Sequence, residues 1–475
     1  MPFRKILSIS LILAVFSAGP FARASDPKIS ELSRKKVGEL HYPQVQFVDL
    51  KNGMRVYLLE DHDLPILQMY AYVRGGGLQD PPDRVGLASL LGGLLRTGGT
   101  QKKSVDQIDR ILEDHGASLE TAGGNEYASA SLKCLSPHTE IFLPLFFEIL
   151  RSPRFDPEKV ELARLRKIEA LRRVNDNAQR IASQEFPKLL YGDSNPYARV
   201  PTVESLNKIK REDLQEFHRR FYGPDRVILA VSGDFKKDDL IRQIEAATEG
   251  WPKAPEALPS VPPVKKEWEG GVYGVMKKGA QSTLMVGHFG EKRFNPDKFA
   301  LILMNFILGG DIFSSRLGEE VRSNRGLAYS IYSHFGLESD YGLFYAAAQT
   351  RSAATGEVIG LIAREIRSFH DGDGFTEASL NFAKESILNQ LVSDWEPPFN
   401  YVKERARLYF YGYPEDYFLT YRTKLGAVTL DDVKTVAKKY LFPDRLKILV
   451  VGDLDTVNGQ LKKFGEMKKI PLKEF

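Results

Sequence analysis

The strongest constraint on the fold of this 475-residue chain is an internal repeat. Residues 221–234 (FYGPDRVILAVSGD) are matched by residues 440–453 (YLFPDRLKILVVGD). Each segment is typical of a helix end, a Pro-Asp turn and a buried β-branched strand closed by Gly-Asp. The pairs Asp213-Leu214 and Asp432-Val433 stand in the same register before the two segments. The chain is therefore a duplication of one unit, which excludes a single large core.

The repeat also suggests the domain boundaries. Residues 251–268 lie between the two copies and contain five prolines. Proline at this density favours an extended connector that continues neither the helices nor the sheet of either copy. We therefore expect an N-terminal domain at residues 25–250, a proline-rich linker at residues 251–268 and a C-terminal domain at residues 269–475.

Each copy mixes strands and helices without regular alternation. Residues 47–50 and 54–59 flank Asn52-Gly53, which is a strong hairpin signal, and residues 66–73 are typical of a strand. One long helical stretch is expected from about Pro157 to Leu190. Strands joined by hairpins, with helices in blocks, predict an α+β fold made of two homologous mixed α/β domains.

Residues 1–24 are typical of a secretion signal. Residues 1–5 are basic, and residues 6–18 form an apolar run that is too short for a membrane-spanning helix. Ala22-Arg23-Ala24 matches a signal-peptidase site. We expect cleavage after Ala24 and a periplasmic protein with no membrane attachment after cleavage; a retained membrane anchor is the alternative.

Charge and cysteine content exclude several functional classes. Arg4, Lys5 and Arg23 belong to the expected signal, and without them the basic and acidic residues of the chain almost balance. This balance gives no support to a nucleic-acid partner. Cys134 is the only cysteine, so an intrachain disulfide and a thiolate zinc cluster are both excluded.

One amphipathic helix has an unusual polar face. Its apolar stripe consists of Leu87, Leu90, Leu91, Leu94 and Leu95. The neighbouring stripe holds Ser89, Gly92 and Gly93. Each glycine inside a helix costs about 1 kcal/mol relative to alanine. Taken by themselves, these residues favour a close backbone packing contact.

This helix, in the run GLASLLGGL at residues 86–94, resembles the zinc helix of the insulinase/pitrilysin family of metallopeptidases. Active members carry an inverted zinc motif, His-x-x-Glu-His, at the positions of Ser89, Gly92 and Gly93. There the two histidines bind zinc and the glutamate is the general base. The resemblance therefore implies a degenerate zinc motif in this chain.

No other zinc site is expected. The third zinc ligand of the family, a glutamate, would fall at Glu169, but an isolated carboxylate makes no zinc site. The eight histidines are all far apart in the sequence, so neither orientation of a helical zinc motif exists. We expect this chain to bind no metal.

The second copy resembles the same family in a different motif. Residues 305–329 contain Gly309-Gly310, an expected helix over residues 315–325 that ends at Gly326, and the start of a strand expected over residues 327–335. The resemblance implies that Arg322 holds a backbone carbonyl of the substrate and that Tyr329 donates its hydroxyl to the forming oxyanion. Gly309 and Gly310 would let a substrate backbone approach closely.

Together these features resemble the zinc-free subunit of a heterodimeric bacterial member of the family. A related partner subunit would then carry His-x-x-Glu-His and the zinc, and the two chains would form the halves of a clamshell chamber for peptides or unfolded proteins. The chain alone would be inactive. A non-catalytic peptide-binding or scaffold protein is the alternative, and an independent hydrolase with unrecognised ligands is the third.

Overall fold

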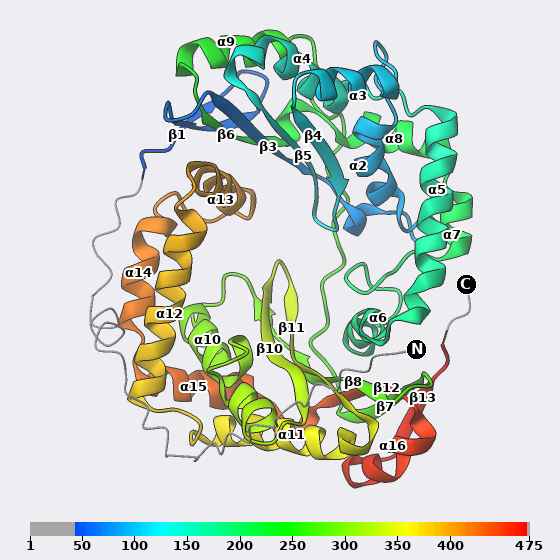
Figure 1. Ribbon diagram of the computed structural model, residues 1–475, viewed down its shortest axis with the longest axis vertical. Helices are drawn as coiled ribbons and strands as arrows, with labels where there is room; N and C mark the ends of the chain where they lie inside the picture. Colours follow the sequence, from blue (N-terminus) through cyan, green and yellow to red (C-terminus); the bar gives the residue numbers. More distant parts are fainter. Residues whose placement is uncertain (1–42, 473–475) are drawn as a thin grey trace, which may run out of the picture. The chain divides into compact units, whose positions relative to one another are not determined.

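The computed structural model describes residues 43–472 (Figure 1). The expected signal sequence and its cleavage site at Ala24 lie outside these residues. The chain from Pro43 onward forms one compact unit. Among residues 43–472, no helix combines the length and the apolar character that a membrane span requires.

The first half of the described chain builds a six-stranded sheet. Its strands are β1 (Gln46–Asp49), β2 (Arg55–Glu60), β3 (Ile66–Arg74), β4 (Ser118–Gly123), β5 (Tyr127–Leu135) and β6 (Val227–Gly233). Its helices are α2 (Leu87–Thr97), α3 (Val105–Asp114), α4 (Thr139–Arg151), α5 (Pro157–Arg172), α6 (Ala178–Tyr191), α7 (Val203–Lys208), α8 (Arg211–Phe221) and α9 (Lys237–Thr248). The strand order is β1-β2-β6-β3-β5-β4, in which only β2 and β6 run parallel.

The second half builds a seven-stranded sheet. Its strands are β7 (Gly271–Met276), β8 (Gln281–Phe289), β9 (Glu291–Lys292), β10 (Ala328–Glu338), β11 (Tyr341–Arg351), β12 (Lys447–Gly452) and β13 (Met467–Ile470). Its helices are α10 (Lys298–Asn305), the π-helical turns η5 (Phe306–Gly310) and η6 (Gly318–Ser323), α11 (Thr355–Asp371), α12 (Glu377–Trp395), α13 (Pro398–Phe410), α14 (Tyr417–Ala427), α15 (Leu430–Tyr440) and α16 (Leu454–Leu461). The strand order is β13-β7-β12-β8-β11-β10-β9.

The two sheets repeat one topology. The run β2-β6-β3-β5-β4 of the first sheet corresponds to β7-β12-β8-β11-β10 of the second, and each neighbouring pair has the same relative direction in both. The strands recognised in the sequence repeat, β6 and β12, occupy the same place in their sheets. The structure thus confirms a mixed α/β fold with an internal duplication.

The expected single helix from Pro157 to Leu190 is wrong, because the chain breaks between α5 and α6. A short 3-10 segment, η3 (Arg173–Asp176), follows α5. Asn177 then caps α6, since its side-chain oxygen accepts the N–H groups of Gln179 and Arg180. The break redirects the chain, and α6 packs against β8 and β12 of the second sheet (Figure 1).

The second half makes the reciprocal contact, in which one of its helices covers the first sheet. Its helix α13 packs against β2, β3 and β6 of the first sheet. Aromatic rings meet there: the centroids of Tyr57 and Tyr409 lie 6.0 Å apart, and those of Tyr72 and Phe410 lie 5.9 Å apart. Each sheet therefore has one face covered by helices of its own half and the other face covered by a helix of the opposite half.

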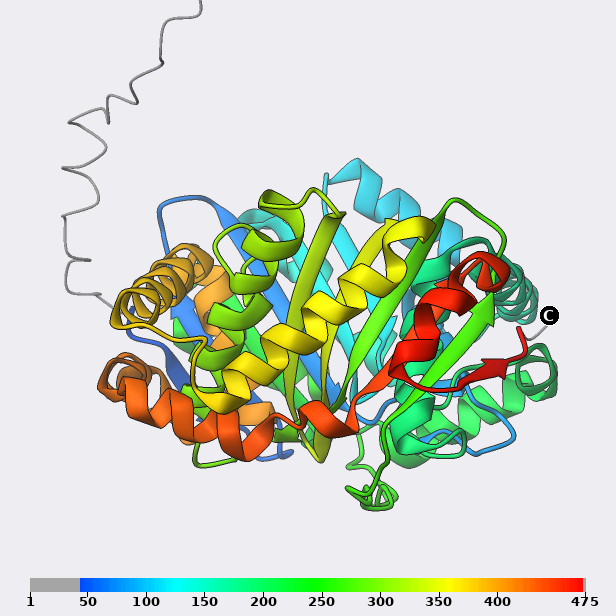
Figure 2. The ribbon, with the colours of Figure 1, turned by 90° about the horizontal axis from the view of Figure 1, so that it is seen from below.

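Strand β8 is apolar on both of its faces, because helices cover the sheet on both sides. Leu284 and Val286 join the core beneath α11, whereas Met285 and Phe289 join the cluster around α6. Figure 2 shows α11 (yellow) lying across the strands of the second sheet. Because successive side chains of a strand point to opposite faces, both sets are buried.

The segment between the two sheets forms no helix or strand from residue 249 to residue 270. It is nevertheless anchored by three buried apolar side chains, those of Trp251, Val264 and Trp268. The indole N–H of Trp268 donates to the carbonyl of Arg445 at 2.8 Å, and the Arg445 guanidinium lies 4.2 Å from the indole ring. The connector is therefore fixed to the first half at Trp251 and to the second half at Val264 and Trp268.

Candidate functional site

The N-terminus of α2 is closed by a buried carboxylate. Asp80 accepts the backbone N–H of Gly86 at 2.6 Å and that of Ala88 at 2.8 Å. Gly86 has φ +106°, a conformation that favours glycine. Burial raises the pKa of Asp80 to about 6, although the two N–H groups act in the opposite direction. These contacts fix the start of the helix that carries Ser89, Gly92 and Gly93.

Gly92 packs backbone against backbone on the edge strand β4. A Cβ atom at this position would lie 2.3 Å from the amide nitrogen of Gly123 and 2.6 Å from the carbonyl carbon of Ala122. No side chain fits there without moving the helix or the strand. Gly93 differs, because a Cβ atom at Gly93 would meet nothing within 4 Å. The close contact expected from the glycine pair is thus made by Gly92 alone.

A lysine contacts the first position of the degenerate motif. The Lys167 ammonium, from α5, donates to the Ser89 hydroxyl at 2.5 Å. Burial lowers the pKa of Lys167, and the nearby Asp80 carboxylate opposes this effect. Glu169, on the same helix, is half exposed and pairs with Arg173 at 3.1 Å. The residue of α5 that contacts Ser89 is therefore Lys167, two residues before Glu169.

These residues do not fit a zinc ion. Ser89 offers one hydroxyl already bonded to an ammonium, Gly92 has no room for a carboxylate side chain, and Lys167 would repel a cation. No cluster of three histidine, cysteine, aspartate or glutamate side chains suited to a metal occurs within residues 43–472. The chemistry of a metal-bound water is therefore not supported at α2.

Arg322 and Tyr329 lie side by side in the second half of the chain. Arg322 is in η6, and its guanidinium carbon lies 5.9 Å from the Tyr329 ring centroid and 4.5 Å from that of Phe313. No ion pair or hydrogen bond to the Arg322 side chain occurs in the described part of the chain, so its five donors face only rings and solvent.

A β-bulge presents Tyr329 to solvent. Ala328 pairs with Thr350 and Ser330 pairs with Gln349, so Tyr329 is an extra residue of β10 without a partner on β11. Its side chain is 89% exposed, the largest exposure among the large hydrophobic side chains of the described residues. The expected strand at residues 327–335 is confirmed, but the expected helix is shorter and ends in the π-helical turn η6.

The loop before η6 is built to expose an aromatic ring. The Asp311 carboxylate accepts the N–H groups of Phe313 and Ser314 and the Ser314 hydroxyl, at 2.9, 2.7 and 2.8 Å. This turn leaves Phe313 72% exposed beside Arg322. Phe313, Arg322 and Tyr329 therefore form one exposed surface, which we call the Arg-Tyr surface.

Of the glycine pair before this loop, Gly309 packs against β10 and Gly310 is exposed. A Cβ atom at Gly309 would lie 2.6 Å from the Ser333 hydroxyl oxygen, and Gly309 itself is buried. Gly310 is exposed, but a Cβ atom there would lie 3.1 Å from both the side-chain nitrogen and the backbone oxygen of Asn305. The absence of a side chain at Gly309 is accounted for by the approach of η5 to β10.

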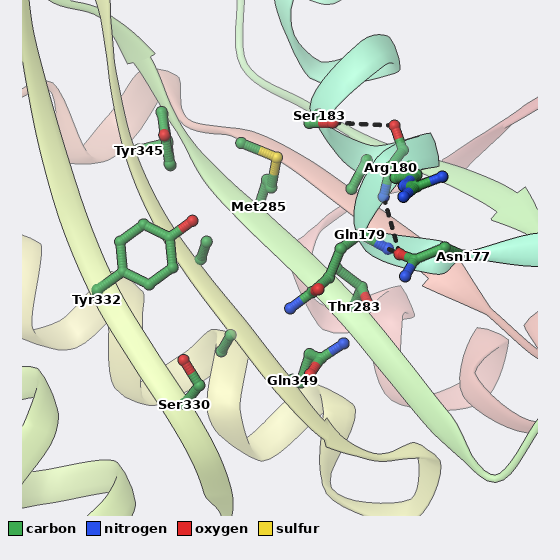
Figure 3. Close-up of a pocket in the computed structure, with 13 residues that line it drawn as sticks. Asn177, Gln179, Arg180, Ser183, Thr283, Met285, Ser330, Tyr332, Tyr345 and Gln349 are labelled. Atoms are coloured by element: carbon green, nitrogen blue, oxygen red, sulfur yellow. Dashed lines mark hydrogen bonds between the residues drawn. The ribbon is translucent and has the colours of Figure 1, made fainter. Parts of the chain in front are cut away.

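A cavity of about 330 Å³ is lined by Ser330, the residue that follows Tyr329 on β10 (Figure 3). Ser330 and Tyr332 of β10 face Gln179 and Arg180 of α6 across it. The remaining lining side chains come from α6 and its N-cap, β8 and β11 and are Asn177, Ala182, Ser183, Thr283, Met285, Tyr345, Ala347, Ala348 and Gln349. The exchange of α6 onto the second sheet thus creates a partly polar groove alongside β10.

Sequence reasoning missed Lys167, Asp311 and Phe313. No local pattern identifies Lys167 or Phe313, because a lysine on an amphipathic helix and a Phe in a loop are ordinarily read as surface residues. Only the aspartate has a weak signal, since the run Asp311 to Ser314 is compatible with an Asx turn. The contact between Lys167 and Ser89 joins residues 78 positions apart and depends on how α5 packs against α2.

Comparison with known families gives two matches along the chain. The family model described as insulinase (peptidase family M16) matches residues 55–195, and the one described as the peptidase M16 inactive domain matches residues 208–387. The helix with Ser89, Gly92 and Gly93 lies in the first match, and Arg322 with Tyr329 lies in the second.

Similar proteins carry contrasting names. An uncharacterized zinc protease of Streptomyces coelicolor is 26% identical over 75% of this chain and 78% of its own length. A protein of Helicobacter pylori called the non-peptidase homolog YmxG is 24% identical over 83% of this chain and 90% of its own length. Names of both kinds therefore occur among relatives at similar distance.

Solved structures share the fold. The crystal structure of a peptidase M16 inactive domain from Pseudomonas fluorescens has a TM-score of 0.78 and 27% identity and covers 86% of this chain and 98% of its own. The periplasmic protease PqqL of Escherichia coli matches with a TM-score of 0.74 and 16% identity over 87% of this chain but only 46% of its own. The present fold thus corresponds to about half of that longer chain.

Proposed function

Because the chain belongs to the insulinase family of peptidases (peptidase family M16), we propose that it is the non-zinc-binding subunit of a heterodimeric zinc metalloendopeptidase. A related subunit with the His-x-x-Glu-His motif would hold the zinc, and peptides or unfolded proteins would be the substrates. The observation that carries this proposal is the contrast between the two halves. Gly92 leaves no space for the family's catalytic glutamate, whereas Arg322 and Tyr329 stand together and exposed.

The proposed roles follow from the donors of the Arg-Tyr surface. Arg322 carries no carboxylate partner within residues 43–472 and is free to donate to a backbone carbonyl of the substrate. Tyr329, held out by the bulge, would donate its hydroxyl to the oxyanion that forms at the scissile carbonyl. Both donors would act across the interface with the partner subunit. Their exposure in the single chain is consistent with this role.

The sheet beside these residues could hold an extended peptide. On its outer edge, β10 pairs with β9 only through Leu337 and Glu338, and the Asn305 side chain donates to the Ser333 carbonyl at 3.3 Å, so the edge free of a partner strand and of this side chain covers residues 328–332 in the described structure. An added strand there would run past Tyr329, with side chains in the groove below α6. We propose that this edge guides the substrate toward the partner's zinc.

The same proposal covers the domains and the location. We take residues 25–250 and 269–475 as two peptidase-like domains that form half of a clamshell chamber, with residues 251–268 as the linker. A periplasmic location after cleavage behind Ala24 would place the subunit where unfolded exported proteins occur.

A non-catalytic peptide-binding or scaffold protein is the second candidate. The packing of Gly92 and the name non-peptidase homolog carried by one relative support it. It predicts association without proteolysis and no dependence on the Tyr329 hydroxyl.

The first experiment isolates the native partner. The tagged mature chain is recovered from the periplasm of its own bacterium, and bound proteins are identified by mass spectrometry. A near-equimolar relative carrying His-x-x-Glu-His supports the heterodimer, and the mixture should then cleave an unfolded protein that neither subunit cleaves alone. Recovery of the chain alone or with itself would favour the scaffold.

The second experiment tests Tyr329 in that mixture. We expect Tyr329→Phe to lower kcat by about 100-fold, because an oxyanion donor is lost. Tyr273→Phe on β7, which removes a hydroxyl that accepts from Lys447, is the matched control and should leave kcat unchanged. Equal kcat for Tyr329→Phe and the unsubstituted subunit would exclude the proposed role.

A further inference from the structure

The two halves contain equivalent cavities outside the groove described above. One of about 470 Å³ lies between α2 and α8, and one of about 590 Å³ lies between α10 and α15. Asp213, Glu216 and Phe217 line the first cavity, and their counterparts in the sequence repeat, Asp432, Thr435 and Val436, line the second. The cavities therefore occupy the same place in the repeat and can be compared directly.

The first cavity has its own carboxylate. Asp80 lines it and accepts two backbone N–H groups at the start of α2. The positive end of the helix dipole and the nearby cations of Lys167 and Arg199 favour the charged carboxylate there. In the first half, the chain itself therefore supplies the anion of the cavity, which is the Asp80 carboxylate.

The second cavity has no equivalent anion among the described residues. Asp297 precedes α10 but makes no side-chain cap. Its carboxylate is bonded instead to the Lys439 ammonium at 2.8 Å and the Tyr440 hydroxyl at 2.7 Å. The other lining carboxylate, that of Asp432, accepts the backbone N–H and the hydroxyl of Thr429.

A half-buried lysine stands at the start of α10. The Lys298 ammonium donates to the Tyr413 hydroxyl at 2.7 Å and to the Tyr417 hydroxyl, and it lies 4.3 and 4.6 Å from the centroids of these rings. It forms no ion pair in the part of the chain that the structure describes. Burial lowers the pKa of Lys298 to about 8, and the charges of Arg293 and Arg407 act in the same direction.

Of the charged groups that act on Lys298, only Glu404 supports its positive charge, and this carboxylate is itself paired with an arginine. Arg293 is paired with Glu126 and Glu338 at 3.6 and 3.5 Å, and Arg407 is paired with Glu404 at 2.6 Å. Lys424, exposed at the rim, adds another positive charge, and the helix dipole at this end of α10 is also positive. A cation without a counter-ion in this position costs stability, as groups at binding sites often do.

We propose that the cavity between α10 and α15 binds the carboxylate of a small organic monoanion, with Lys298 as its counter-ion. The tyrosine oxygens accept from the lysine, so the O–H groups of Tyr413 and Tyr417 remain able to donate to that carboxylate. Phe294, which is 61% exposed, and the tyrosine rings offer apolar walls for an aromatic or aliphatic body. A ligand with one negative charge would balance the one positive charge of the half-buried Lys298 ammonium. This inference does not rest on the proposed peptidase function.

The same chemistry could come from a free carboxylic acid or from the C-terminus of a peptide. Benzoate represents the first source, and a short peptide ending in phenylalanine represents the second. The corresponding peptide amide has the same apolar body without the charge, so it separates carboxylate recognition from aromatic packing.

The test follows the acetylation of individual lysines in the full mature chain. Sulfosuccinimidyl acetate is applied between pH 6.5 and 10, and the rate at each lysine is read by mass spectrometry. We expect a midpoint for Lys298 near pH 8, far below that of Lys278, an exposed lysine whose pKa is raised by Asp455 and Asp453. At pH 8, saturating benzoate or acid peptide should slow acetylation of Lys298 by about fivefold, as a rise of one pKa unit would require.

Binding is measured in parallel by calorimetry with benzoate. Lys298→Met should abolish the signal, whereas Lys438→Met, which removes an exposed lysine of α15, should retain it. Protection by only one of the two carboxylate probes identifies the source and supports the proposal. Equal protection by the peptide amide, or no protection by either carboxylate with a fully folded protein, would overturn it.

Discussion

Two neighbouring glycines of α2 have opposite surroundings. Gly92 touches the backbone of β4 so closely that a methyl group cannot be added, whereas Gly93 faces open space. The helix with the degenerate motif therefore touches the adjacent strand at Gly92, the position that matches the general-base glutamate of the family motif. The pair provides an experiment in which the same substitution is made at two consecutive residues.

We expect Gly92→Ala to lower the free energy of unfolding by about 1–3 kcal/mol, because the new methyl group overlaps Gly123. Gly93→Ala is the matched control and should raise the free energy of unfolding by up to about 1 kcal/mol, since alanine has the higher helix propensity. Urea unfolding of both variants measures these values. Equal effects of the two substitutions would contradict the packing difference.

At the scale of elements, the exchanged helices decide how the duplicated halves are joined. Helix α6 belongs to the first half in sequence but fills the cluster on the second sheet, and α13 does the reverse. The ends of the two helices are also bonded across the halves. The Tyr191 hydroxyl donates to the Tyr341 carbonyl at 2.7 Å, and the Tyr411 hydroxyl donates to Glu126 at 2.9 Å. Without the opposite half, each sheet would lose the helix that covers one of its faces.

The buried ring of Phe186 tests this exchange. It lies 6.0 Å from Tyr345 on β11, so Phe186→Ala should cost about 3–5 kcal/mol and speed hydrogen exchange chiefly in β8 and β12 of the second sheet. Ile244→Ala, a buried residue of α9 that packs with α4 in the first half, should instead speed exchange there. Mass spectrometry locates the change, and faster exchange confined to the first sheet in Phe186→Ala would refute the exchange.

At the scale of the whole molecule, each half buries a neutral histidine. Burial lowers the pKa of His218 to about 4, although its Nε2 atom bonds the Leu150 carbonyl at 2.7 Å. Burial likewise lowers the pKa of His288 to about 3, while its Nε2 atom accepts the Phe442 N–H. Protonation of His288 at that nitrogen would remove the acceptor. Both residues therefore favour the folded state only while they are neutral.

The sign of the pH effect follows from these shifts. The unfolded chain takes up protons at histidine near pH 6.5, before the native protein does, so the free energy of unfolding should fall as the pH drops below 6.5. Each histidine contributes about 1.4 kcal/mol per pH unit, and Asp80, whose pKa is raised to about 6, opposes one of them between pH 6 and 4. Urea titrations from pH 7 to 4 should show this loss in a single transition by tryptophan fluorescence and circular dichroism. Two separate transitions, or constant stability, would contradict it.

Much of the fold was predictable because its signals are local. The Asn52-Gly53 turn, the strands β3, β6, β10 and β12 and the apolar stripe of α2 are each encoded by residues close in sequence, and the structure confirms them. The break before Asn177 was missed, because the helical pattern continues on both sides and the change of packing partner has no local signature. The position of Tyr329 on a strand was predicted, whereas the bulge that exposes it was not.

The sequence by itself determined the duplication and the mixed fold class, and its resemblance to the insulinase family implied the degenerate motif at Ser89, Gly92 and Gly93. These depend on periodicity, on constant spacing and on which side chains are present. Only the tertiary structure decided that α6 and α13 cover each other's sheets, that Lys167 bonds Ser89 and that Lys298 faces a cavity without a counter-ion among the described residues. The physical reason is that packing and electrostatic surroundings are set by residues distant in the chain, which no local pattern specifies.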